Sequence, residues 1–247
     1  MGMLDKIEIP RKMCAVIFLL DTSGSMDGAP IGAVNSAIEN VLPELITMNE
    51  NNPDNEIRVA VMKFDFDAEW VVGGDELLTP EEVKNSWNDL DANGYTSMGA
   101  AFEALNEKLS TSHGFMRRAS GSVAPVLFLL SDGAPTDDYQ AGLQKLKANT
   151  WYKIAVRVAV GYSEKCNDDV LRDFTGNSET VLHTDDPAEL KRMIKFIAVT
   201  SSRVASQGSG LSTESDNPDD NTQKTADAIT AQGGALNAPM DEDDGKW

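Results

Sequence analysis

Cysteine and histidine are scarce in this 247-residue sequence, which has two of each. Cys14 opens an apolar run and is expected in the core, and Cys166 lies far from it along the chain. Two such cysteines form no disulfide framework, and with only His113 and His183 to help we expect no zinc site. This cysteine usage favours a reducing, intracellular setting, and therefore a cytoplasmic protein.

Positive charge and long hydrophobic runs are also lacking. The chain has 21 Lys and Arg against 40 Asp and Glu, a net charge of -19. A nucleic-acid backbone or an anionic membrane is bound by clustered Lys and Arg, so we expect neither partner. No stretch approaches the roughly 20 apolar residues of a membrane span. The charge fits a cation-binding surface instead, or a partner that is basic or brings a metal-coordinating group.

The composition divides the chain into three parts. Residues 1–12 are a polar lead-in, and residues 13–204 carry the patterns of one domain. Hydrophobic residues make up 41% of the sequence, which is enough for a sizeable core. Residues 205–247 are rich in small polar and acidic residues and lack aromatic residues before Trp247. We expect this acidic tail to be disordered.

Apolar runs alternate with stretches of helical spacing through the domain. Such alternation predicts an α/β fold: a doubly wound, mostly parallel six-stranded sheet with helices on both faces. The short link 65–67 indicates an antiparallel hairpin at one edge. We expect 110–124 to be an exposed loop. The predicted strands are 14–20, 57–64, 68–72, 125–130, 154–160 and 180–183. The main helices are expected to start near residues 30, 79, 98, 168 and 186, and a further helix contains Leu143 and Leu146.

The first apolar run stops at Asp21, and oxygen-bearing side chains follow at alternate positions, Ser23 and Ser25. Gly24 lets the backbone turn tightly between them. A carboxylate and two hydroxyls are hard ligands, and they suit Mg²⁺ or Mn²⁺. The same residues are also ordinary turn formers, so this segment alone does not distinguish a metal site from a capped turn.

A second apolar run ends in the same way, with Asp132 in an Asp-Gly loop. In a doubly wound sheet, ligands bind at the carboxyl ends of the strands where the strand order reverses. If the strands before Asp21 and Asp132 are neighbours there, both carboxylates meet in one crevice.

These motifs, with Thr96 about seventy residues after the first, resemble the von Willebrand factor A family between Lys12 and Thr200. The resemblance implies that family's doubly wound fold with one antiparallel edge strand. It also implies a metal-ion-dependent adhesion site (MIDAS), a site in which a divalent cation is held by residues of the two motifs. The implied ligands are Asp21, Ser23, Ser25, Thr96 and Asp132.

The implied function is protein binding without chemistry. Mg²⁺ or Mn²⁺ keeps an open or water-filled position, at which an Asp or Glu of a protein partner binds the ion. We expect a monomer whose partner-binding rim is Met26, Asp27, Tyr95 and Pro135. Within the family, the stretch from Leu20 to Met26 with Gly28, Pro30 and Ile31 resembles the bacterial, cytosolic TerY type. That resemblance implies a role in a bacterial stress or tellurium-resistance system.

Other classes of protein stay open at this stage. A Mg²⁺-dependent phosphohydrolase of the haloacid dehalogenase type also places a nucleophilic Asp, here Asp21, after its first strand. Its acid/base Asp belongs two residues later, where this chain has Ser23. A serine hydrolase is opposed by the absence of a nucleophile-elbow sequence, and a structural module with a vestigial site is opposed by the complete motif. We interpret the nearby acids Asp65, Asp67, Asp137 and Asp138 as solvated turn residues.

Overall fold

The strand β1 (Lys12–Asp21) lies at the centre of a six-stranded sheet, between β2 (Asn55–Phe64) and β4 (Val126–Ser131). The computed structural model describes residues 10–117, 119–163, 166–207 and 220–236. The sheet order is β3-β2-β1-β4-β5-β6, where β3 is Ala68–Val72, β5 is Val156–Tyr162 and β6 is Val181–Thr184. Edge strand β3 pairs antiparallel and all other pairs are parallel. The predicted doubly wound fold is confirmed.

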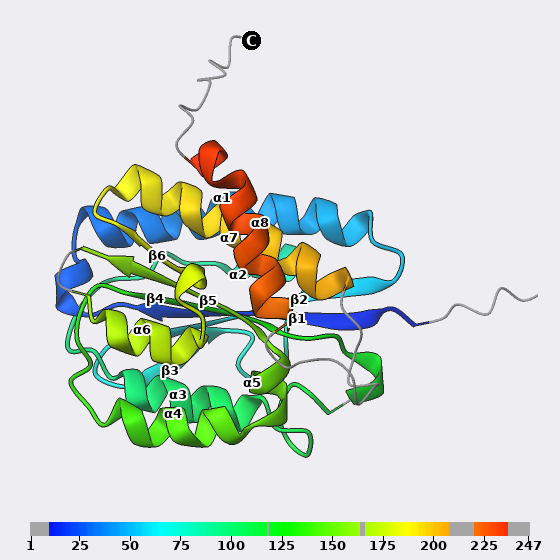
Figure 1. Cartoon of the computed structure of the whole chain (residues 1–247), viewed down its shortest axis with the longest axis horizontal. Coiled ribbons are helices and arrows are strands. Elements are labelled where there is room, and N and C mark those ends of the chain that lie inside the picture. The colour runs from blue at the N-terminus through cyan, green and yellow to red at the C-terminus, as the bar shows by residue number, and fades with distance from the viewer. Residues whose placement is uncertain (1–9, 118, 164–165, 208–219, 237–247) are drawn as a thin grey trace, which may run out of the picture.

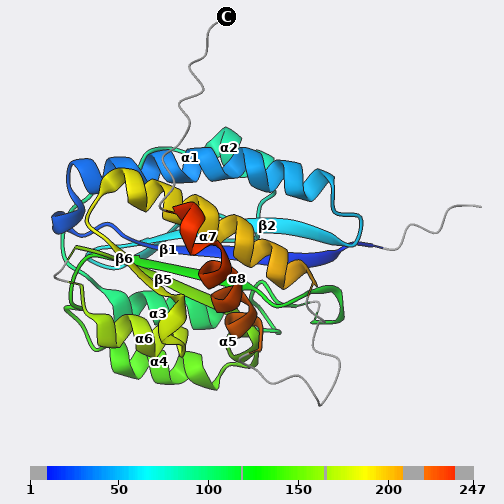
Figure 2. The same cartoon turned by 45° about the horizontal axis from the view of Figure 1, so that its top comes forward.

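Helices cover both faces of the sheet (Figures 1 and 2). One face carries α1 (Ala29–Glu50), α2 (Pro80–Ser86), α7 (Pro187–Gln207) and α8 (Asp220–Leu236). The other carries α3 (Met98–Lys108), α4 (Tyr139–Ala148), α5 (Thr150–Ile154) and α6 (Asp168–Thr175). The short 3-10 helices are η1 (Gly24–Met26), η2 (Ala119–Gly121) and η3 (Ser178–Thr180).

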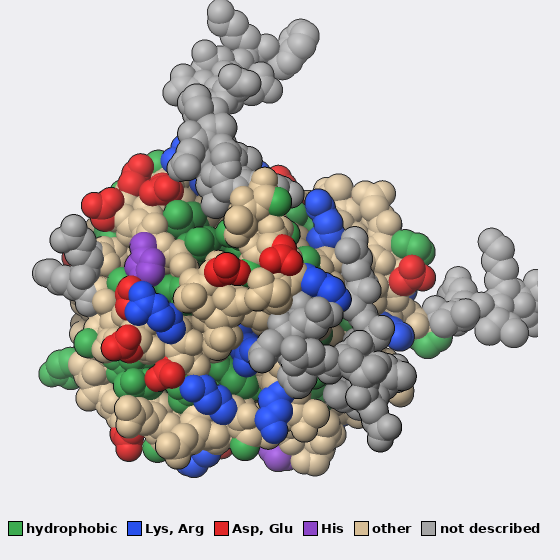
Figure 3. Space-filling model, viewed as in Figure 1, with side chains coloured by type: hydrophobic (Ala, Val, Ile, Leu, Met, Phe, Trp, Pro, Cys, Tyr) green, Lys and Arg blue, Asp and Glu red, His purple; other side chains and the backbone are tan. Residues whose placement is uncertain are grey.

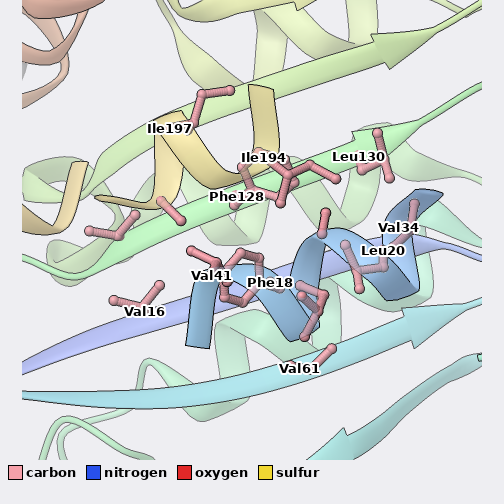
Figure 4. Close-up of a cluster of buried hydrophobic side chains, with 14 of the residues drawn as sticks. Val16, Phe18, Leu20, Val34, Val41, Val61, Phe128, Leu130, Ile194 and Ile197 are labelled. Carbon is pink, nitrogen blue, oxygen red and sulfur yellow. The ribbon is translucent and has the colours of Figure 1, made fainter. Parts of the chain in front are cut away.

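The unbroken apolar run of β1 exists because helices bury the strand on both faces. Val16, Phe18 and Leu20 point toward α1 and α7, where they meet Ile194 and other apolar side chains of the helices (Figure 4). The alternate residues, such as Ile17, join the core under α3 and α4. Full burial of each large side chain contributes about 1.5–3 kcal/mol. This double burial fixes the register of β1 and so the position of the loop that follows it.

The expected exposed loop 110–124 is partly wrong. Met116, Val123 and Ala124 are fully buried or nearly so. The Val123 backbone N–H donates to the carbonyl of Met13 at 2.9 Å, which ties this segment to the start of β1. These buried residues were not predicted because the sequence around them is mostly polar.

The expected disorder of residues 205–247 is also wrong in part. Ala205 is buried within α7, and residues 220–236 form α8. This helix buries Ala226 and Ile229, and the hydroxyl of Thr222 donates to the carbonyl of Ala155 at 3.1 Å. Small residues and hydroxyls dock α8 on the end of β5 and on α7, although the segment has no continuous apolar stripe. The rest of the predicted tail, 208–219 and 237–247, lies outside the described residues.

Among the described residues, no helix combines the length and the apolar character needed to cross a membrane.

Candidate metal centre

The candidate site lies where β1 and β4 end side by side. Leu20 of β1 pairs with Leu130 of β4, so Asp21 and Ser131 are the next residues of adjacent parallel strands. Asp132 follows directly. In Figure 1 these carboxyl ends lie at the left of the molecule, next to the blue turn that follows β1. The fold therefore places both Asp-containing loops at one edge of the sheet, as predicted.

Asp21 is completely buried, and both of its carboxylate oxygens accept hydrogen bonds. The backbone N–H of Ser23 donates to Oδ1 at 2.9 Å, and the hydroxyl of Ser131 donates to Oδ2 at 2.6 Å. Burial raises the pKa of Asp21 to about 6; these hydrogen bonds partly oppose the shift, and the charge of Asp132 adds to it. Sequence reasoning missed Ser131, although it directly precedes Asp132 at the end of an apolar strand.

The hydroxyls of Ser23 and Ser25 face Asp132. The Ser25 hydroxyl donates to Asp132 Oδ1 at 2.8 Å, and the Ser23 hydroxyl lies 3.5 Å from the same oxygen. The two hydroxyl oxygens are 3.1 Å apart. The turn η1 brings them together, so one carboxylate and two hydroxyls from distant parts of the chain converge.

Thr96 reaches the same place from the loop before α3. Its backbone N–H donates to the hydroxyl of Thr136 at 3.2 Å, and the Thr136 N–H donates to the Thr96 carbonyl at 3.0 Å. A Cβ built on Gly133 would lie 3.7 Å from Thr96 Oγ1, so this hydroxyl is beside the residue that follows Asp132. Thr96 is 5% exposed. The structure thus brings all five sequence-predicted ligands to one end of the sheet.

Backbone hydrogen bonds hold the loop after β1 against the end of β2 and against the loop before α3. Thr22 donates its N–H to the Phe64 carbonyl at 3.0 Å and accepts from the Asn93 N–H at 2.7 Å. Gly24 donates to the Gly94 carbonyl at 3.3 Å. The oxygen-bearing side chains are therefore positioned before any ligand arrives.

Asp137 has a positioning role that the sequence did not reveal. Its carboxylate accepts hydrogen bonds from the backbone N–H groups of Gly99 at 2.9 Å and Ala100 at 3.0 Å. A negative charge at the start of α3 is stabilised by these N–H groups and by the helix dipole. Asp137 thereby links the loop after β4 to the helix that follows Thr96, which our interpretation of it as a solvated turn residue overlooked.

The structure places the predicted rim residues differently from one another. Asp27 is exposed and Pro135 is half-buried, but Met26 is fully buried. The η1 turn directs Met26 into the core beneath the site, so it is excluded from any rim. Tyr95 is 63% exposed and packs edge-to-face against Phe66, with ring centroids 5.4 Å apart. Phe66, 60% exposed and in the β2–β3 turn, was missed.

The donor set is chemically uniform: two carboxylates, three hydroxyls, and no sulfur or imidazole. Such a set suits a hard cation such as Mg²⁺ or Mn²⁺. The raised pKa of Asp21 supports the fit, because two neighbouring carboxylates in a buried setting disfavour the ionised form until a cation compensates for them. The residues therefore fit a divalent ion.

Comparison with known proteins gives a consistent result. The family model of the von Willebrand factor type A domain matches residues 15–196. An uncharacterized protein, sll0103, from Synechocystis sp. is 28% identical over 187 residues, which are 73% of this chain. The chain spans 39% of that relative's length.

Several solved structures share the fold. A von Willebrand factor type A protein from Catenulispora acidiphila has a TM-score of 0.59 at 21% identity, covering 77% of this chain and 43% of that one. The vWF domain of the pilus tip protein Mfa5 from Porphyromonas gingivalis has a TM-score of 0.61 at 10% identity, covering 83% and 100%. Proximal thread matrix protein 1 of the mussel byssus, with zinc in its MIDAS motif, has a TM-score of 0.61 at 18% identity, covering 77% and 48%.

Proposed function

Because the chain belongs to the von Willebrand factor type A family, we propose that it is a metal-dependent protein-interaction module. Its ligands for a divalent cation are Asp21, Ser23, Ser25, Thr96 and Asp132. The observation that supports this most directly is the convergence of the Ser23 and Ser25 hydroxyls on Asp132 Oδ1, within 3.5 Å, above the buried Asp21.

Each ligand residue has a distinct task. Asp132 and the two serine hydroxyls hold the ion, which we infer to be Mg²⁺ or Mn²⁺. Asp21 supplies negative charge from the buried end of β1, and Thr96 adds a neutral oxygen from the loop before α3. With two carboxylates against three neutral oxygens, the bound ion retains affinity for a further anionic ligand.

The partner supplies that ligand. We propose an Asp or Glu side chain of a protein partner, because a carboxylate is the anionic oxygen ligand that proteins offer to such ions. Asp27, Tyr95 and Pro135 border the site and contact the partner around that carboxylate. The chain's net charge of -19 makes a metal-independent attraction for an acidic partner weak, so binding depends on the ion.

A phosphohydrolase with Asp21 as nucleophile is disfavoured by the position of this side chain. Both carboxylate oxygens are engaged, by the Ser23 N–H and by the Ser131 hydroxyl, and the residue is completely buried. A nucleophile must instead present a free oxygen to its substrate. These contacts suit a residue that maintains the charge and shape of the site.

Calorimetric titration of Mg²⁺ and Mn²⁺ into chelator-stripped protein tests the proposal. We expect binding in wild type, loss in Asp132→Ala, and a weaker affinity in Ser25→Ala. Asp27→Asn is the matched control, since it removes a neighbouring exposed carboxylate outside the ligand set. The same samples are assayed for hydrolysis of a phosphate ester; metal-dependent hydrolysis that is lost with Asp21→Ala would replace the binding module by the phosphohydrolase.

A pull-down with the stripped and the metal-loaded protein tests the partner. We expect the metal-loaded protein to retain a partner that the stripped protein does not retain. Retention should be lost when the acidic residue of the partner is replaced by the corresponding amide, Asn or Gln. We further propose a cytoplasmic monomer of a bacterial stress or tellurium-resistance system, on the TerY-like sequence from Leu20 to Ile31. Partners encoded outside such a system would contradict this last proposal.

A further inference from the structure

We propose that Cys166, Asp168 and His183 form a second metal site, which takes zinc or a similar transition-metal ion. The spacing of these residues along the chain matches no zinc motif, and none was expected from the sequence. Folding nevertheless places one potential ligand atom from each within 4.8 Å of the others. The site shares no ligand with the oxygen-lined site at Asp21 and Asp132.

The three side chains come from segments that meet at the carboxyl end of β5. Cys166 lies in the connection after β5, Asp168 begins α6, and His183 lies in β6. Cys166 Sγ is 3.6 Å from Asp168 Oδ1, and His183 Nε2 is 2.6 Å from the same oxygen. On the face shown in Figure 3, the histidine side chain at the left lies beside acidic and basic side chains.

Both distances to Asp168 Oδ1 can be compared with those around a coordinated ion. Tetrahedral zinc with bonds of about 2.0–2.3 Å separates a sulfur from an oxygen ligand by about 3.5 Å, and a nitrogen from an oxygen by about 3.3 Å. The sulfur–oxygen edge already has this length. The imidazole must move by less than about 1 Å from the carboxylate, which a partly exposed side chain permits.

Gly161 makes the approach of thiol and imidazole possible. A Cβ at this position near the end of β5 would lie 2.6 Å from Cys166 Sγ and 2.9 Å from His183 Cδ2. Any larger residue would push both side chains away from Asp168. The close approach is therefore built into the backbone at the end of the strand.

The surroundings provide access and an orienting contact. The cluster borders a pocket of about 430 Å³ lined also by Ser163, Thr184 and Asp185. Arg172 donates to Asp168 Oδ2 at 2.8 Å, which leaves Oδ1 directed toward the sulfur and the imidazole. Contacts of this kind to the second oxygen orient a metal-ligating carboxylate. Three protein ligands beside an open pocket leave the fourth position of a tetrahedral ion for water.

The ligand chemistry selects a different ion from the first site. Thiolate and imidazole favour zinc, cobalt and related ions, whereas the hydroxyl-rich site favours Mg²⁺ or Mn²⁺. Burial and the negative charge of Asp168 raise the pKa of the Cys166 thiol to about 11, so without metal the thiol keeps its proton. Metal binding would release this proton, and the cation would compensate for the negative charges of the thiolate and of Asp168.

Cobalt titration of the full chain is the direct test. Stripped protein, kept reduced with a phosphine, is titrated with Co²⁺ in excess Mg²⁺ so that the oxygen-lined site is occupied. Only a thiolate ligand gives the intense sulfur-to-cobalt charge-transfer band, and tetrahedral ligation adds strong visible absorption. The other thiol, Cys14, is fully buried in β1.

We expect a saturable charge-transfer band that Zn²⁺ displaces. Cys166→Ser should abolish it, and His183→Gln should weaken cobalt binding at least about 100-fold, since even outer-shell partners of a metal ligand contribute about 10–100-fold. Asp169→Asn is the matched control: it alters the neighbouring exposed carboxylate and should leave the band unchanged. Circular dichroism verifies that each variant is folded. Absence of the band in wild type, or its persistence in Cys166→Ser, would overturn the proposal.

Discussion

Replacing Asp21 by Asn is expected to stabilise the metal-free protein at neutral pH while it removes the ion affinity of the site. Burial raises the pKa of Asp21 from 3.8 to about 6. At about 1.4 kcal/mol per pKa unit, the ionised carboxylate costs the folded state about 3 kcal/mol. Asparagine has the same shape and carries no charge, so the variant avoids this cost.

The effect depends on pH with a definite sign. The folded state binds the Asp21 proton more tightly than the unfolded state does, so the unfolding free energy of the wild type falls as pH rises between about 4 and 6. The two proteins should therefore be similarly stable near pH 4. At about pH 7 the variant should be more stable by about 1–3 kcal/mol, the lower value applying where its amide fits less well beside the Ser131 hydroxyl.

Denaturant unfolding in the presence of a chelator, from about pH 4 to pH 7.5, measures the difference. Addition of Mg²⁺ at about a hundredfold its dissociation constant should then stabilise the wild type by about 2.7 kcal/mol and leave the variant unchanged. Asp137→Asn is the control, because it removes a carboxylate that stabilises the start of α3 and should lower stability by about 0.5–1 kcal/mol. If Asp21→Asn destabilises the chelated protein at neutral pH as Asp137→Asn does, the reasoning from burial is refuted.

Three further predictions concern the scaffold. Asn35→Leu should lower the unfolding free energy by about 1–3 kcal/mol, because Asn35 is buried and its amide both donates to and accepts from the backbone of Leu90. Calorimetric melting measures the change in stability, and an unchanged melting temperature would contradict the prediction. Gly142→Ala should destabilise the α3–α4 contact, since its Cβ would lie 2.6 Å from a backbone oxygen of α3, whereas Gly32→Ala, with nothing within 4 Å, should be neutral or stabilising. Equal melting temperatures for the two variants would show that the helices can separate without cost. Deletion of residues 208–247 should lower the unfolding free energy by on the order of 3 kcal/mol, because the α8 contacts are lost. If the truncated and the full chain unfold at the same urea concentration, a structural role for α8 is contradicted.

The fold was predictable where local pattern and global burial agree. The apolar run of β1 is buried on both faces, and a run without alternation is the signature of such a strand. The short link 65–67 between two apolar stretches predicted the antiparallel edge hairpin, which β2 and β3 form. The candidate site followed from the same logic, because adjacent parallel strands end at the same edge.

What was missed depends on tertiary packing. Helix α8 docks through Thr222, Ala226 and Ile229 on surfaces that other segments create, so its own sequence carries little periodic signal. Met26 is the last residue of η1, and the 3-10 geometry of this turn directs it inward. The Cys166 cluster is invisible to spacing rules, since a strand, a connection and a helix start supply one ligand each.

The distances along the chain between the residues of the first site have a consequence for biosynthesis. The hydrogen bonds that join Ser25 to Asp132 and Ser131 to Asp21 span 107 and 110 residues. A nascent chain that has emerged only as far as α3 contains most of the proposed metal ligands but lacks Asp132. In such a chain β4 is also absent, so β1 has a neighbouring strand on one side only. An ion bound at this site can therefore stabilise only a chain that has emerged beyond β4. Acquisition of metal during translation would mark the moment at which the two halves of the domain join.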